Sequence, residues 1–318
     1  MSLAEDIKQK AIELGFDLVG ITKACPIDAG QVELLANWLN SGYAGQMNYM
    51  HNNFEKRIDP TKLLENAKSV ICLGLNYRPP EQKLKPTEAT APMGKVANYA
   101  QYEDYHPFIK KHLCKLTEFI TSIAGASLKF RICVDSAPLA ERSLAVRAGV
   151  GFIGKNHMLI NPELGPQIFL GEIITDLELQ TDEPITGNCS DCNKCITACP
   201  TGALRDDGQF DANKCISYLT IEYKGKIPLG LAEKIGNRLF GCDECVLACP
   251  YEENGHVCKN KLLKFYNDRN KLNLRKVLSL SRELFEAKFA DSSFKRLGLE
   301  RLKRNAKICL ANITSRKA

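Results

Sequence analysis

The sequence predicts an α+β fold in three segments, and three observations support this prediction. Residues 1–180 alternate between helical and strand-like apolar patterns, residues 181–258 hold most of the cysteines, and residues 259–318 are basic with helical spacing. Alternating helices and short apolar strands favour a buried sheet covered by helices. We therefore expect an N-terminal α/β domain, a cysteine domain and a short α-helical segment with these boundaries, which suits the length of 318 residues.

The first segment contains three amphipathic stretches and four short apolar runs. Helices are expected at 2–15, 29–41 and 106–125, and strands at 17–22, 69–75, 130–134 and 167–174. Residues 76–95 contain four prolines, which predicts a loop. Connections of this length are often functional, for example as a lid or a binding loop.

Eight of the fourteen cysteines fall between Cys189 and Cys249. The first run, CSDCNKCITACP, has the C-x2-C-x2-C-x3-C-P spacing of bacterial ferredoxins, in which the fourth cysteine binds the other cluster. The second run is divided, because 26 residues separate Cys215 from the start of CDECVLACP at Cys242. This spacing predicts a bacterial-ferredoxin-like domain with two [4Fe–4S] clusters.

Exchange of the fourth ligand between the two clusters assigns the cysteines to two sets. The first cluster is expected to take Cys189, Cys192, Cys195 and Cys249, and the second Cys199, Cys215, Cys242 and Cys245. Zinc is the alternative because C-x2-C pairs also suit it, but zinc does not call for two C-x3-C-P ends. The six other cysteines are scattered, and we interpret them as small buried apolar side chains.

The C-terminal segment is basic although the rest of the chain is acidic. Residues 261–318 contain sixteen Lys or Arg and five Asp or Glu, against 27 and 32 in the first 260 residues. A basic end suggests a polyanionic partner, and a solvated helical surface is the simpler alternative. The runs LRKVLSLSRELFEAKF and LERLKRNAKICLANI have apolar residues at helical spacing, so we expect one helix pair of the α-solenoid kind.

The sequence gives no sign of a membrane partner. No apolar run reaches the roughly 18 residues that a spanning helix needs. The first residues, MSLAEDIKQKAIELGF, predict an amphipathic helix and not a signal peptide. We therefore expect a cytoplasmic protein, in which reduced thiols favour metal binding over disulfides. We also expect a monomer, because no coiled-coil heptads occur.

A candidate site follows the strand expected at 130–134. Asp135 ends this strand before a turn and a helix, and the glycines from Gly149 to Gly154 would let a ligand approach the backbone closely. Lys155, Asn156 and His157 follow these glycines as polar groups. A helix N-cap is the ordinary alternative for Asp135. No strand is followed by a dinucleotide fingerprint, so we expect electrons from an external low-potential donor.

These residues together resemble the epoxyqueuosine reductases, cobalamin-dependent enzymes that complete queuosine in tRNA. The resemblance runs from about residue 5 to residue 313. Its segments are VDSAPLAER, GFIGKN, CSDCNKCITACPTGAL, CISYLTIE, IGNRLFGCDECVLACP and FKRLGLERLKRNAKICLANI. It implies a base-off cobalamin in the N-terminal domain, two [4Fe–4S] clusters and a HEAT-like C-terminal segment. Its reaction removes the epoxide oxygen of epoxyqueuosine at the wobble position of tRNA, with electrons passing from the clusters to cobalamin.

The resemblance also assigns residues by position. Asp135 matches the proton donor of the family, and a site away from water would raise its pKa and keep it protonated. The implied corrin contacts are Arg57, Asn98, Asp135, Lys155, His157, Met158, Leu159, Leu170, Ser217 and Asp243. An axial His157 ligand is an alternative, but no D-x-H-x-x-G string occurs, so we expect an unligated lower face.

The basic segment supplies the expected tRNA contacts. The phosphate-contact candidates are Lys295, Arg296, Arg301, Lys303 and Arg304. Many relatives carry longer helical-repeat tails, so we expect less surface here for the tRNA arm.

Two alternative functions share part of this pattern. A cobalamin-dependent reductive dehalogenase would share the cobalt and the two clusters, but such enzymes usually carry export signals, and a basic tail has no purpose for a small halocarbon. A ferredoxin-type electron carrier fused to a binding module would bind no cobalamin.

Overall fold

A four-stranded antiparallel sheet forms the centre of the N-terminal region in the computed structural model, which describes residues 2–81, 91–125 and 127–315. Its strands follow the order β1 (Leu18–Lys23), β2 (Ser69–Asn76), β7 (Ile168–Thr175) and β4 (Phe130–Cys133). All eight residues of β2 are buried, because the sheet is covered on both faces. The four strands predicted from sequence are confirmed to within about two residues at either end.

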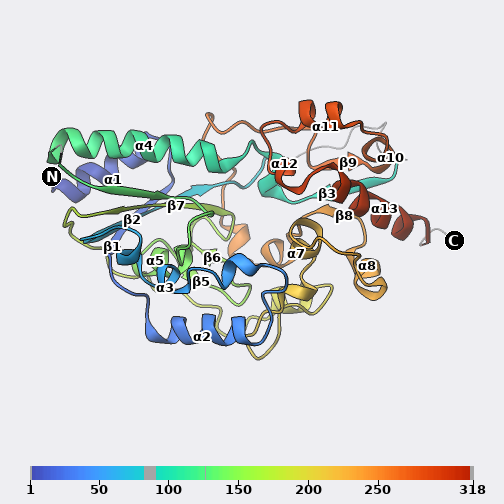
Figure 1. The fold of residues 1–318 in the computed structure, drawn as a ribbon, viewed down its shortest axis with the longest axis horizontal. Coiled ribbons are helices and arrows are strands. Elements are labelled where there is room, and N and C mark those ends of the chain that lie inside the picture. Colours follow the sequence, from blue (N-terminus) through green and yellow to red (C-terminus); the bar gives the residue numbers. More distant parts are fainter. Residues whose placement is uncertain (1, 82–90, 126, 316–318) are drawn as a thin grey trace.

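Helices cover both faces of this sheet (Figure 1). On one face lie α1 (Leu3–Glu13) and α4 (Tyr105–Ala124), and on the other α2 (Ala29–Asn40), α3 (Phe54–Ile58) and α5 (Glu141–Arg147). Alternate residues of the strands enter the two cores: Ile71 and Leu73 pack under α4, whereas Val70 and Cys72 pack under α5. The predicted helices at 2–15, 29–41 and 106–125 are therefore confirmed. A small hairpin of β5 (Phe152–Ile153) and β6 (Leu159–Ile160) follows α5.

The cysteine region consists of short elements. They are α6 (Lys194–Ala198), α7 (Ile216–Ile221), α8 (Leu229–Ile235), β8 (Arg238–Phe240) and α9 (Glu244–Leu247). The described 3₁₀ turns are Asn48–Met50, Pro60–Lys62, Asn98–Gln101, Ala212–Lys214 and Pro250–Glu253.

A second sheet unites the three segments of the chain. It has the order β8-β3-β9, in which β3 is Met93–Val96 and β9 is Lys271–Asn273. Its strands thus come from the regions predicted as the N-terminal domain, the cysteine domain and the C-terminal segment. The prediction of a loop over 76–95 was wrong at its end, since β3 begins at Met93; residues 82–90 of that loop lie outside the described residues.

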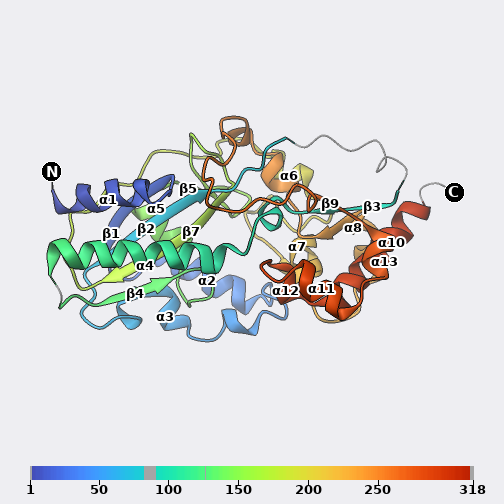
Figure 2. The ribbon, with the colours of Figure 1, turned by 90° about the horizontal axis from the view of Figure 1, so that it is seen from above.

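The C-terminal region is helical, with α10 (Leu274–Leu278), α11 (Arg282–Lys288), α12 (Phe294–Leu297) and α13 (Leu299–Ser315). Figure 2 shows these helices grouped at the end of the molecule opposite the paired helices α1 and α4. The single helix expected over 274–289 was wrong. The chain turns at 279–281, where the Ser281 side chain accepts a hydrogen bond from the Leu284 N–H and begins α11.

Two further predictions concern the burial of the scattered cysteines and the absence of a membrane-spanning helix. Cys72, Cys133 and Cys309 are buried as predicted, whereas Cys25, Cys114 and Cys258 are only partly buried. Across residues 2–81, 91–125 and 127–315, every helix is too short or too polar to cross a bilayer.

Candidate cofactor and active site

The eight thiols of the cysteine region form two groups of four. In the first group, Cys249 lies close enough to Cys189, Cys192 and Cys195 for their charges to affect it. These four side chains line a cavity of about 270 Å³. Across the described residues, no three His, Cys, Asp or Glu side chains converge tightly enough to hold a single metal ion. Thiols placed around a cavity suit an iron–sulfur cube better than one zinc ion.

The second group contains the remaining four cysteines. The Cys245 thiol lies near Cys199, Cys215 and Cys242, and burial raises its pKa. Burial opposes ionisation at Cys199 as well, but the N–H groups of Leu204 and Thr201 donate to this sulfur, and the net effect lowers its pKa. Such N–H donors stabilise a thiolate, the form that binds metal. The grouping is the one predicted from spacing, and ligation of iron by these thiols stays a prediction.

Two short helices exchange the fourth cysteine between the groups. Cys195 lies on α6 and is followed by Cys199, and Cys245 lies on α9 and is followed by Cys249. Because α6 and α9 pack against each other, each helix begins at one group and leads to the other. The two groups are therefore neighbours, as electron transfer between two clusters requires.

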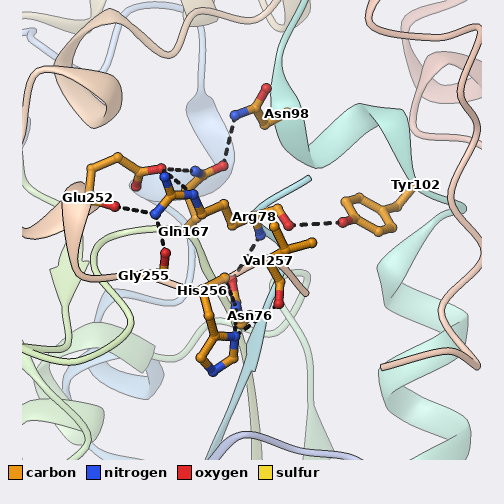
Figure 3. A network of polar contacts seen from close by, with 9 residues as sticks. All are labelled: Asn76, Arg78, Asn98, Tyr102, Gln167, Glu252, Gly255, His256 and Val257. Atoms are coloured by element: carbon orange, nitrogen blue, oxygen red, sulfur yellow. Dashed lines mark hydrogen bonds and ion pairs between the residues drawn. The ribbon is translucent and has the colours of Figure 1, made fainter. Parts of the chain in front are cut away.

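A buried polar network fixes the cysteine region against the first sheet (Figure 3). Arg78, which follows β2, donates to the carbonyl groups of Glu252 and Gly255, and its Nε lies 3.4 Å from Glu252 Oε1. Gln167, just before β7, donates to the same carboxylate. Burial raises the pKa of Glu252, while the Gln167 hydrogen bond and the Arg78 charge oppose this rise.

The same network continues to the second thiol group. Asn98 Nδ2 donates to Gln167 Oε1 over 2.9 Å, and the Asn98 N–H donates to Asp243 Oδ2 over 2.6 Å. Asp243 directly follows Cys242 in the chain. The end of β2 and the start of β7 are therefore connected to segments beside both groups of cysteines, by hydrogen bonds of side chains with one another and with the main chain.

Asp135 lies on the turn after β4 in a left-handed conformation, with φ of 54°. Its Oδ2 is 3.0 Å from His106 Nε2, and the other ring nitrogen of His106 is 2.6 Å from Asp104 Oδ1. Arg296, from α12, brings its guanidinium to 3.8 Å from the Asp135 carboxylate and 2.9 Å from His106 Nε2. Asp135 is not a helix N-cap, because α5 begins after Ala140.

The charges of this network decide its protonation. Burial opposes a charged His106, but the two aspartates outweigh burial and raise its pKa to about 9. Burial would raise the pKa of Asp135, yet the His106 hydrogen bond and the charges of His106 and Arg296 lower it. The prediction of a raised pKa at Asp135 was therefore wrong, because nearby cations outweigh desolvation. The electrostatics of this network therefore favour a proton on His106 over a proton on Asp135.

Two predicted corrin contacts carry buried nitrogen atoms without partners in the described part of the chain. These atoms are Arg57 Nε and His157 Nε2. Arg57 otherwise donates from Nη2 to the Tyr49 carbonyl over 3.1 Å, and the His157 ring lies 5.6 Å from Phe210. Buried polar nitrogens are usually paired, so both positions fit a ligand with polar groups, such as the amide-rich corrin.

The other predicted contacts fall in several places. The Lys155 ammonium donates to the Ser190 carbonyl and to Asn193 Oδ1, so it faces the first thiol group. Met158 and Leu159 lie in or beside the small hairpin, and Leu170 lies on β7. Ser217 lies in the first turn of α7, and its N–H donates to the Cys215 thiol.

Asn98 and Asp243 line a separate cavity of about 390 Å³ beside Cys242. Burial raises the pKa of Asp243 to about 6, although the Asn98 N–H opposes this rise. The two predicted contacts are thus brought together, and their contact with corrin stays a prediction.

Two predicted phosphate contacts also hold parts of the fold together. Arg301 donates to the carbonyl groups of Leu297 and Ile221, and Arg304 to those of Leu219 and Tyr223. These guanidinium groups bind carbonyls at the C-terminal end of α7, where the helix dipole favours positive charge. Contact of Arg301 and Arg304 with tRNA stays a prediction, although these hydrogen bonds already engage both guanidinium groups. Lys295 is exposed and Lys303 is partly exposed, and both stay predictions.

Sequence reasoning missed several residues of the site. His106 was not proposed, and Arg296 was expected at tRNA phosphate rather than beside Asp135. The signal available for His106 was its place in the DYH string, where Asp104 caps α4 and accepts from the His106 N–H. No signal in the sequence connects Arg296 with Asp135, because 160 residues lie between them.

Comparison with known proteins agrees with this geometry. The family model described as epoxyqueuosine reductase QueG, DUF1730 matches residues 57–136, and one described as a 4Fe-4S double cluster binding domain matches residues 188–252. The chain is 42% identical over 302 residues to the epoxyqueuosine reductase of Leadbetterella byssophila, covering 95% of this chain and 96% of the relative.

Solved structures give the same result. An epoxyqueuosine reductase in complex with an epoxyqueuosine-modified tRNA-Tyr stem loop is similar at a TM-score of 0.89 and 32% identity, covering 98% of this chain and 81% of that one. The Bacillus subtilis epoxyqueuosine reductase, described with its aspartate catalytic loop swung out of the active site, is similar at a TM-score of 0.88 and 32% identity, covering 98% and 81%.

Proposed function

Because the chain belongs to the epoxyqueuosine reductase family, we propose that it reduces epoxyqueuosine to queuosine at the wobble position of tRNA, using cobalamin and two [4Fe–4S] clusters. The observation that carries this proposal is the meeting of Asp135, His106 and Arg296 in a chain that also gathers eight thiols in two groups. Near full-length similarity to epoxyqueuosine reductases favours this function over a reductive dehalogenase or a simple electron carrier.

The residues present suit both cofactors. The two thiol groups would hold one cluster each, and Arg57 and His157 would give their unpartnered nitrogens to the corrin. When bound, these groups supply low-potential electrons and the cobalt centre that removes the epoxide oxygen. The protein itself supplies position and protons.

Proton supply is the task of the Asp135 network. Conversion of an epoxide into an alkene takes up two electrons and two protons and releases water, so a proton must reach the departing oxygen. Ionised Asp135 cannot give a proton that it lacks, but His106 holds one at Nε2, 3.0 Å away. A proton passing from His106 to Asp135 and on to the oxygen would leave neutral His106, which Asp104 keeps in orientation through Nδ1.

The tRNA substrate follows from the relative that was solved with a modified stem loop. Lys295 and Lys303 remain our candidates for phosphate contacts. We further propose an external low-potential electron donor, a monomer and a cytoplasmic site of action, where tRNA is modified.

The test is conversion of epoxyqueuosine in tRNA, measured by nucleoside analysis under anaerobic conditions. The wild-type chain with cobalamin and a reductant should form queuosine and should hold eight irons. Asp135→Asn keeps the shape but cannot relay a proton, so turnover should fall by at least about a hundredfold, at the lower end of general acid catalysis. Iron content and cobalamin binding should be unchanged. Asp207→Asn, an exposed aspartate away from this network, is the matched control.

Absence of queuosine from the wild-type reaction would overturn the proposed function. Full activity of Asp135→Asn would remove only Asp135 from the mechanism.

A further inference from the structure

A buried carboxyl group lies behind the Asp135 turn. Glu172 is on β7, an inner strand of the first sheet, and its side chain is 0% exposed. In the register of the sheet it lies opposite Cys72 on β2 and Cys133 on β4. Residues directly opposite each other point to the same face of a sheet. Since both cysteines belong to the core beneath α5, Glu172 enters this apolar layer between two thiols.

Among the described residues, no N–H or hydroxyl group donates a hydrogen bond to the Glu172 carboxyl. Neither of its oxygens has a well-formed partner in the part of the chain that the structure describes. Ionisation of a carboxyl without a compensating partner is unfavourable in such a layer, and burial raises the pKa of Glu172 far above its usual range. The Glu141 carboxyl acts on Glu172 at hydrogen-bonding range. Two carboxyl groups can hydrogen-bond only if one carries a proton.

Glu141 connects this buried group to Asp135. Glu141 begins α5, and its Oε1 accepts the backbone N–H of Asp135 over 2.6 Å. This bond supports Asp135 in its left-handed conformation, which residues other than glycine adopt only rarely. Burial and the Asp135 charge raise the pKa of Glu141 to about 7. Glu141 is therefore the more acidic partner, and the proton resides mainly on Glu172.

We propose that Glu172 and Glu141 share a proton and that this pair holds the Asp135 turn in its catalytic conformation. Glu172 donates its O–H to Glu141, and Glu141 accepts the N–H of Asp135 through its other oxygen. The proton stays within the pair, so both are positioning residues. The inference rests on the proposed function, because it takes Asp135 as the residue that acts on substrate.

The neighbouring charges favour a proton on Glu172 and an ionised Glu141. Groups that interact with the pair come from six elements or turns: Arg57, Tyr105, Asp135, Arg142, Cys72 and Cys133. The two arginines act on Glu141 and favour its ionised form. Burial raises the pKa of both thiols beside Glu172, which favours their neutral form, so they add no negative charge to this layer.

The experiment compares two substitutions at Glu172. Glu172→Leu fills the apolar layer but cannot donate to Glu141, whereas Glu172→Gln keeps a donor that does not ionise. We expect kcat for epoxyqueuosine to fall about tenfold to a hundredfold in Glu172→Leu, because misplacement of a reacting group costs that much. KM for tRNA should stay within about twofold, and Glu172→Gln should keep kcat within about threefold of wild type. Glu178→Gln, with a side chain 81% exposed, is the matched control.

Infrared spectroscopy tests the proton without using activity. The wild-type protein should show the C=O band of a protonated carboxylic acid, which labelling with ¹³C-glutamate shifts and Glu172→Gln removes. Full kcat in Glu172→Leu, or an equal loss in the Gln variant, would contradict the proposal. So would absence of the band from wild type, a result that stands even if Glu172→Leu fails to fold. Failure of the proposed function would look different: no queuosine would form in wild type while the band remained.

Discussion

At the scale of single residues, the candidate active site contains a histidine whose pKa is raised by its neighbours. His106 lies between Asp104 and Asp135, and both carboxylates favour its protonated form over the cost of burial. Histidine ordinarily loses its proton near pH 6.5. In this protein it should stay charged until about pH 9.

The raised pKa of His106 makes stability depend on pH. A group whose pKa is higher in the folded state than in the unfolded state stabilises the folded protein. This contribution is complete at pH values below the unfolded-state pKa and is lost as the pH rises through the folded-state pKa. The melting temperature should therefore fall between about pH 6.5 and pH 9 more steeply in wild type than in His106→Gln. Differential scanning calorimetry at matched ionic strength measures the difference. Equal slopes for the two proteins would show that His106 is not charged in the folded state.

Sequence reasoning found Asp135 but not the groups that control it. Asp135 follows an apolar strand within a recognisable motif, so its position could be predicted. Its pKa depends on His106 and Arg296, which come from two distant helices. Such contacts are set by tertiary packing, and a wrong expectation for the pKa followed.

At the scale of elements, α7 connects the second thiol group with the C-terminal helices. Its first turn donates N–H groups to the Cys215 sulfur, and its last carbonyls accept from Arg301 and Arg304 on α13. Asn305, which is fully buried on α13, also donates to the Thr220 carbonyl. The position of this thiol therefore depends on a helix almost a hundred residues away.

Removal of one of these arginines should weaken the contact between α7 and α13. Arg304→Met keeps the aliphatic stem but leaves the carbonyls of Leu219 and Tyr223 without this donor. We expect a loss of about 1–3 kcal/mol in the free energy of unfolding, the usual cost of an unpaired buried polar group. Chemical denaturation under anaerobic conditions measures the loss. Lys307→Met, at an exposed position of the same helix, is the control and should change stability by less than about 0.5 kcal/mol.

Helices and strands with a strong local sequence pattern could be predicted. Strands that form only by pairing with residues far away in the sequence could not. The amphipathic period of α4 and the apolar run of β2 are readable in any context. The strands β3, β8 and β9 have only three or four residues each and exist because they pair with one another. The turn between α10 and α11 was missed because two serines interrupt a run whose apolar spacing continues across it.

At the scale of the whole molecule, the cysteine region has little core of its own. Its helices have four to seven residues, and isolated helices of that length are unstable in water. Much of its apolar surface is buried in a cluster that includes side chains from β3 and from the C-terminal helices. Bound clusters should therefore be a large part of what stabilises it.

Iron removal tests this dependence. Treatment with an oxidant and a chelator should lower the melting temperature, and far-ultraviolet circular dichroism should show loss of helix. Protection of β2 and β7 from hydrogen exchange should largely persist, because their core lies between α4 and α5. Anaerobic reconstitution with iron and sulfide should restore the original transition. A melting temperature that does not depend on iron content would contradict this account.

The second sheet also limits how this chain can be divided. A gene fragment for residues 181–258 would encode all eight clustered cysteines, yet β8 would lose β3, its neighbour in the sheet. Strand edges left open in this way invite aggregation. The electron-relay module therefore cannot be transplanted into another protein as a cassette. Gene recombination that keeps the cysteine region folded must therefore transfer the N-terminal and C-terminal regions together with it.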